Sequence, residues 1–260
     1  MLKQYKNKIM TEQSLYNYCL RMGDNALILS YRLSEWCSNG PMLEEDLALT
    51  NFALDMIGRA QAILKYASEL QGGVKTEDDL AYRRSEREYY NNLITELPNG
   101  DFAQTIVRQL FISAFEFYFF TELQKSNNAT LLAIAVKTLK EVKYHLMHAT
   151  DWVIRLGDGT TESHKRMQDA INYLWMFTGE LFEMDLIDTT LIEKGIGVDL
   201  MLLQPKWHRH IQQVMYDATL QLPEEGFMQT GSRKGIHTEY LGHILSEMQY
   251  LQRTYPDAIW

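Results

Sequence analysis

Three side chains near the middle of the chain have the types and the spacing of metal ligands. Glu141 and His145 are four residues apart, so they share one face of a helix, and His148 lies almost one turn further along. Carboxylate and imidazole groups are common ligands of transition metals in proteins. Such a cluster forms either a mononuclear metal site or a ladder of interior hydrogen bonds, and we favour the ladder.

A further acid, Glu116, stands alone in an apolar segment. It is the only charged residue between Arg108 and Glu122, and aromatic residues flank it on both sides. A buried carboxylate must find a partner or take up a proton. Glu116 is therefore predicted to be buried, and either paired or protonated.

The centre that most often combines such ligands on helices is a di-iron site, which uses two Glu-x-x-His pairs and two further acids. None of the seven histidines has an acid three residues before it. The residues at those positions are Val142, His145, Thr161, Pro205, Trp207, Lys234 and Tyr240. The chain is therefore predicted to hold no di-iron centre of its own.

The remaining acids resemble a di-iron site that has lost ligands. Asp55 is followed by Gly58 where the motif has histidine, and Glu141 is followed by Tyr144 in the same place. Neither glycine nor a neutral phenol replaces an imidazole ligand. The positions of this degenerate site are Asp24, Asp55, Gly58, Glu116, Glu141, Tyr144 and His145.

Asp24 and Asp55 also have a simpler explanation. Each interrupts a largely apolar helical segment. Each is either solvated or paired with a nearby base such as Arg21 or Arg59, and the sequence leaves both alternatives open.

These residues lie in segments with the periodicity of helices. Apolar residues recur at intervals of three and four, and turn-forming pairs such as Gly72-Gly73 separate the segments. Sustained two-residue alternation and a Gly-rich phosphate loop do not occur in the sequence. Helices are predicted over 11–37, 44–70, 76–97, 101–125, 129–156, 161–184, 185–194, 202–220 and 238–254.

The helices predict an all-α fold, a ferritin-like helical bundle with additional C-terminal helices. Short connections pair 11–37 with 44–70 and 101–125 with 129–156 as two hairpins. Residues 1–10 are expected to be an N-terminal extension, either disordered or foreign to the native chain, and residues 11–260 a single ferritin-like domain. The basic turn at 233–237 is predicted to be exposed, where it could contact an anionic ligand or an acidic partner.

Composition restricts the partners and the compartment. A net charge of −9 argues against nucleic acid as a partner. Neither a signal peptide nor an apolar run of about 20 residues, the length of a membrane span, is present. Cys19 and Cys37 lie about 27 Å apart along one helix, too far for a disulfide, and free thiols suit a reducing compartment. The prediction is a cytoplasmic protein without contact to nucleic acid or membrane.

Several stretches, in order over residues 12–260, carry a family signature. They are Leu20-Arg-Met-Gly-Asp-Asn-Ala26, Arg32-Leu-Ser-Glu-Trp-Cys37, Asp46-Leu-Ala-Leu-Thr-Asn51, Leu54-Asp-Met-Ile-Gly58, Leu97-Pro-Asn-Gly-Asp-Phe-Ala103, Lys140-Glu-Val-Lys-Tyr-His145, Arg155-Leu-Gly-Asp-Gly-Thr160, Lys234-Gly-Ile-His-Thr-Glu239, Glu247-Met-Gln-Tyr-Leu-Gln-Arg253 and the terminal Trp260. With them the chain resembles the structural subunit of ring-1,2-phenylacetyl-CoA epoxidase, the multicomponent bacterial monooxygenase of aerobic phenylacetate catabolism.

The resemblance implies a hetero-oligomer in which this subunit is a scaffold. The implied partners are a homologous catalytic subunit with a di-iron centre, a small bridging subunit, and a reductase that uses flavin, an iron–sulfur cluster and NADPH. In this family the subunit has lost the metal site, which agrees with the missing Glu-x-x-His pairs. No catalytic residue and no cofactor are therefore predicted for this chain.

Two other functions stay open from the sequence. One is an autonomous ferritin-like metalloprotein with an atypical site at Glu116, Glu141, His145 and His148. The other is a storage or ligand-binding protein without an oxygenase partner. The absence of Glu-x-x-His counts against both.

Overall fold

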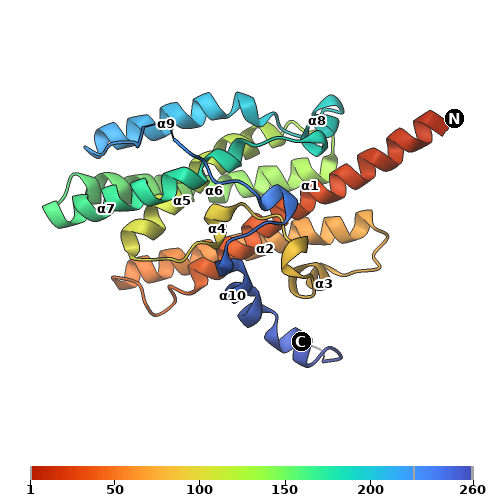
Figure 1. Ribbon diagram of the computed structural model, residues 1–260, viewed down its shortest axis with the longest axis horizontal. Helices are drawn as coiled ribbons and strands as arrows, with labels where there is room; N and C mark the ends of the chain where they lie inside the picture. The colour runs from red at the N-terminus through yellow and green to blue at the C-terminus, as the bar shows by residue number, and fades with distance from the viewer. Residues whose placement is uncertain (1, 225, 259–260) are drawn as a thin grey trace. The chain divides into compact units, whose positions relative to one another are not determined.

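The computed structural model describes residues 2–224 and 226–258, and every regular element within these ranges is a helix (Figure 1). The all-α prediction is confirmed, and this content is consistent with a ferritin-like helical bundle. The chain divides into two compact units, Met1–Pro98 with Gly231–Trp260, and Asn99–Thr230. The single domain expected over 11–260 stays a prediction.

Two long helices, α1 (Leu2–Ser34) and α2 (Leu43–Leu70), pack along each other as the first hairpin of unit 1. They approach closely at Gly23, where a Cβ atom would lie 2.7 Å from Cδ2 of Leu64. On α2 the buried apolar residues recur at intervals of three and four, as the periodicity of the sequence predicted; they include Leu49, Ala53, Met56, Ala60, Ile63 and Ala67. Helix α1 begins earlier than expected, so residues 2–10, assigned to a disordered or foreign extension, continue this helix.

The helix expected over 76–97 is broken into short pieces. Only α3 (Glu77–Tyr82) and α4 (Leu93–Glu96) are α-helical, and a 3-10 turn (Glu86–Glu88) lies between them. A capping box joins Ser85 to Glu88, whose carboxylate accepts the Ser85 N–H at 2.8 Å, so a new turn starts where a continuous helix would pass. Within the segment Arg84, Asn91 and Glu96 are buried although they are polar, which helical periodicity does not reveal.

The C-terminal helices α10 (Glu239–Met248) and α11 (Tyr250–Thr254) return to this broken segment of unit 1. Between them, the Gln249 side-chain amide donates to the Arg84 carbonyl at 2.9 Å and to the Tyr89 hydroxyl at 2.8 Å. The single helix expected over 238–254 is therefore two helices with a buried amide at the junction.

Unit 2 is built around α5 (Phe102–Leu123) and α6 (Ala129–Gly157), with α7 (Thr161–Leu174), α8 (Leu186–Glu193) and α9 (Gln204–Asp217). The apolar helix α5 is mostly buried. The Trp207 indole N–H of α9 donates to the Phe111 carbonyl of α5 at 2.9 Å. The helix expected over 161–184 ends at Leu174, because two 3-10 turns place Trp175 and further aromatic side chains in the core.

Two further predictions from the sequence concern disulfide bonds and membrane-spanning segments. Cys19 is buried and Cys37 exposed, and both are free thiols, as predicted. Within the described ranges, none of the helices has both the length and the apolar character needed to cross a bilayer.

Candidate functional site

Asp24, the first acid of the degenerate site, is completely buried in unit 1 and paired with an arginine. Arg84 donates through Nη1 to Asp24 Oδ2 at 3.0 Å, and the Tyr90 backbone N–H donates to the same oxygen at 3.0 Å. Burial acts to lower the pKa of Arg84, but the charge and hydrogen bond of Asp24 outweigh it, so that pKa is raised overall. The guanidinium supplies the positive charge that a metal ion would supply. Asp24 is therefore not an open ligand.

The second pair of positions lies on α2. Asp55 is half-buried, and Gly58 lines a surface groove. A Cβ atom at Gly58 would have no atom within 4 Å. The position where the motif requires an imidazole thus faces open space.

The remaining positions lie on α5 and α6. Glu116 is 8% exposed, so its predicted burial is confirmed. His145 is fully buried, whereas Tyr144 is 48% exposed. Glu141 is half-buried, and its carboxylate lies 3.8 Å from the ammonium group of Lys137. The side chains of these successive positions thus point into different surroundings.

These residues do not fit a di-iron centre. Asp24 is paired with a guanidinium, Gly58 has no side chain, and Tyr144 points towards solvent. In the part of the chain that the structure describes, no three side chains of the types His, Cys, Asp and Glu gather closely enough to hold a metal ion. The atypical site considered for the autonomous metalloprotein is not assembled there either.

The structure instead contains a buried ion pair that sequence reasoning missed. The side chains of Glu96 and His237 are both 0% exposed, and His237 Nδ1 lies 2.9 Å from Glu96 Oε2. The other ring nitrogen, Nε2, lies 2.8 Å from the Tyr89 carbonyl oxygen. The expectation that the turn at 233–237 is exposed is therefore wrong for His237. The left-handed backbone of Gly235 (φ 64°) turns the chain just before this residue.

The partners of the imidazole define its protonation. A carbonyl oxygen only accepts, so Nε2 must carry a hydrogen. Glu96 already accepts from the Thr238 N–H at 2.6 Å and from the Asn91 amide at 2.8 Å, as a carboxylate would. The raised pKa of His237 favours the form in which Nδ1 donates to Glu96 and the ring is an imidazolium. Burial acts to lower the pKa of His237, but the hydrogen bond and charge of Glu96 outweigh it and raise that pKa.

Further hydrogen bonds tie the C-terminal segment to the same part of unit 1. Arg253 donates to the Arg84 carbonyl at 3.1 Å, and Arg83 donates to the Pro256 carbonyl at 2.8 Å. The Tyr31 hydroxyl donates to Glu247. The ion pair therefore belongs to a latch that holds the last helices in place. The only sequence signal for it is an acid and a histidine in otherwise apolar or turn-forming surroundings.

The long helices also carry apolar side chains on their outer faces. On α2 they are Leu43, Leu47, Leu54 and Ile57, and on α6 they are Leu132, Val136, Tyr144 and Met147. The four on α2 lie within a sector of about 80°, since each residue turns a helix by about 100°. A helix that is apolar towards its neighbour and also outwards is typical of one with a further partner.

Comparisons with known proteins identify relatives of this chain. Residues 2–260 match the profile of the family described as "Phenylacetic acid catabolic protein". The chain is also 50% identical, over 243 residues, to an Escherichia coli (strain K12) protein that is named as a subunit of 1,2-phenylacetyl-CoA epoxidase. The alignment covers 94% of this chain and 98% of that protein.

Proposed function

Because the chain belongs to the phenylacetic acid catabolic protein family, we propose that it is a subunit of the phenylacetyl-CoA epoxidase of phenylacetate catabolism. In this role it forms a hetero-oligomer with a homologous catalytic subunit, which it supports without performing chemistry itself. A small bridging subunit and an NADPH-dependent reductase with flavin and iron–sulfur centres complete the proposed system.

One observation carries the proposal. The 50% identity to the Escherichia coli epoxidase subunit extends over 94% of this chain and 98% of that protein. An alignment of this extent includes the segments around Asp24, Gly58 and Tyr144. The chemistry of these three positions favours a supporting role, because none of them offers the ligand that a di-iron centre requires.

Charge supports the proposed division of work between the subunits. A di-iron centre needs several carboxylates to balance its charge. In this chain the Asp24 carboxylate is balanced by Arg84. The iron, and with it the oxygen chemistry, is therefore assigned to the catalytic partner, while this chain contributes apolar and polar surface to the assembly.

Iron analysis tests this assignment. The chain is expressed aerobically with added iron, purified alone and analysed for metal, and we expect no stoichiometric iron. About two irons per chain, the content of a di-iron centre, would contradict the proposal and favour the autonomous metalloprotein. Co-expression with the catalytic homologue, followed by size-exclusion chromatography, tests assembly in the same material.

A further inference from the structure

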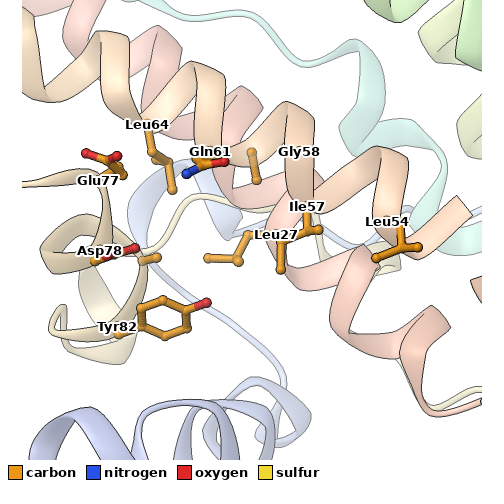
Figure 2. Close-up of a pocket in the computed structure, with 11 residues that line it drawn as sticks. Leu27, Leu54, Ile57, Gly58, Gln61, Leu64, Glu77, Asp78 and Tyr82 are labelled. Atoms are coloured by element: carbon orange, nitrogen blue, oxygen red, sulfur yellow. The ribbon is translucent and has the colours of Figure 1, made fainter. Parts of the chain in front are cut away.

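A groove in the surface of unit 1 runs along α2, between α1 and α3 (Figure 2). Its apolar lining includes Leu27 of α1 and Leu54, Ile57 and Leu64 of α2. A second hollow shares Leu27, Leu54 and Ile57 and continues towards Met248, so the two form one groove. We name it the α2 groove.

The polar residues of the α2 groove lie mainly on one side. Figure 2 shows Glu77, Asp78 and Tyr82 of α3 across the groove from the α2 side chains. No cation lies within ion-pair distance of Glu77 or Asp78 among the described residues, whereas the neighbouring Asp79 pairs with Arg83 at 3.3 Å. The edge of an apolar groove thus carries two acids in the first turn of α3 that have no ion-pair partner among the described residues.

The α2 groove continues into the apolar stripe on the outer face of α2. Leu54 is 61% exposed, and Leu47 and Leu43 extend the same face towards the start of the helix. From Leu43 to Leu64 the helix covers about 32 Å at 1.5 Å per residue, the length of a helix of about 20 residues. At Gly58 no side chain covers the backbone, so another helix can approach closely there.

We propose that the α2 groove binds an amphipathic helix of the homologous catalytic subunit, one that carries Lys or Arg beside its apolar face. This inference rests on the proposed function, because it requires that the chain assembles with other subunits. The apolar face of the helix covers Leu54 and Ile57, and its basic side chains meet Glu77 and Asp78.

The charge of the groove distinguishes this occupant from two others. A coenzyme A thioester carries several phosphate charges, which the two acids repel. A second copy of this chain brings a net charge of −9 and the same acidic edge, so like charges would meet. A basic helix is the occupant that both neutralises the acids and covers the apolar surface.

Two groove variants and one control test the proposal. Gly58→Gln fills the open position with a polar side chain, and Glu77→Lys with Asp78→Lys reverses the charge of the edge. The control, Asp169→Lys with Glu193→Lys, makes the same change of net charge at exposed positions of unit 2. Thermal melting of each purified chain shows that it folds, and Gly58→Gln is expected to melt at or above the wild-type temperature.

Affinity is measured between each variant and the purified catalytic homologue from the same organism. We expect at least tenfold weaker binding for both groove variants and a change below twofold for the control. The loss in the charge-reversed variant should shrink at high salt, because salt screens exposed charges. If the wild-type chain binds and both groove variants bind with an affinity within twofold of the wild-type value, the α2 groove is not the binding site. That result would overturn this inference and leave the proposed function standing. No complex with the wild-type chain would overturn the proposed function as well, and a homodimer broken by Gly58→Gln would identify a second copy as the occupant and overturn the proposal.

Discussion

Replacing His237 with glutamine tests the buried ion pair on which the C-terminal latch depends. Glutamine keeps a hydrogen-bond donor of similar reach but cannot carry the charge. In the wild type, the Glu96 side chain faces three hydrogen-bond partners, His237, Asn91 and the Thr238 backbone, and the variant retains the last two. At pH 6.5 we expect the variant to lose about 1–3 kcal/mol of the free energy of unfolding, the cost of weakening one charged hydrogen bond at a buried site.

The pH dependence is the sharper part of this prediction. Since Glu96 raises the pKa of His237 in the folded chain, the stabilisation is fully present below the unfolded pKa of about 6.5 and is lost as pH rises through the folded pKa. Between the two values the folded state holds one more proton than the unfolded state. The free energy of unfolding should fall there by about 1.4 kcal/mol per pH unit.

The assay is urea unfolding of wild type and His237→Gln at intervals from pH 7 to 8.5. Taking the difference between the two chains removes the contributions of groups that titrate in both. Burial lowers the pKa of His210, so that residue titrates mainly below this window. The stability gap should narrow as pH rises. A gap that stays constant over the whole window would refute the imidazolium–carboxylate pair.

Further variants at Arg84, Asp24, Gly58 and Glu116 test the interior charges and the open helix face. Arg84→Met leaves the Asp24 carboxylate buried without its arginine and should cost about 3–5 kcal/mol in urea unfolding; adding Asp24→Asn should restore part of this, and equal stability of the single and double variants would contradict the pairing. Gly58→Ala should stabilise the chain by about 0.5–1 kcal/mol in thermal melts, because Gly58 is inside a helix with open space at its Cβ position; a lower melting temperature would mean that the position is not open. Glu116→Gln should cost little, whereas Glu116→Ala should cost more because it leaves a cavity. If both Glu116 variants melted with the wild type, the carboxylate would be solvated.

Helical periodicity predicted the long helices because their buried residues recur at the intervals of three and four that it detects. The stripe on α2 from Leu49 to Ala67 is buried, and the apolar centre of α5 lies in the core. Periodicity failed at 76–97 and 161–184, where individual side chains decide the backbone. Arg84 must reach Asp24, and Trp175 must pack against Trp207, with ring centroids 5.8 Å apart. A continuous helix would direct these side chains elsewhere.

The missing di-iron ligands of the candidate site could be predicted from the sequence. The buried ion pairs found in the structure could not. Gly58 and Tyr144 can be identified from spacing, since a motif four residues long is local. The pairs Asp24–Arg84 and Glu96–His237 join residues 60 and 141 positions apart, and no local pattern links them. Both lie in unit 1, and both depend on the irregular segment that periodicity assigned to a helix.

The central claim is that this chain enables a catalytic partner and does not itself react. The most direct measurement is NADPH-dependent turnover of phenylacetyl-CoA by the catalytic homologue, with the reductase and the bridging subunit present, in the presence and absence of this chain. We expect turnover only when both the catalytic subunit and this chain are present. Full turnover without this chain, or turnover by this chain without the catalytic subunit, would contradict the account.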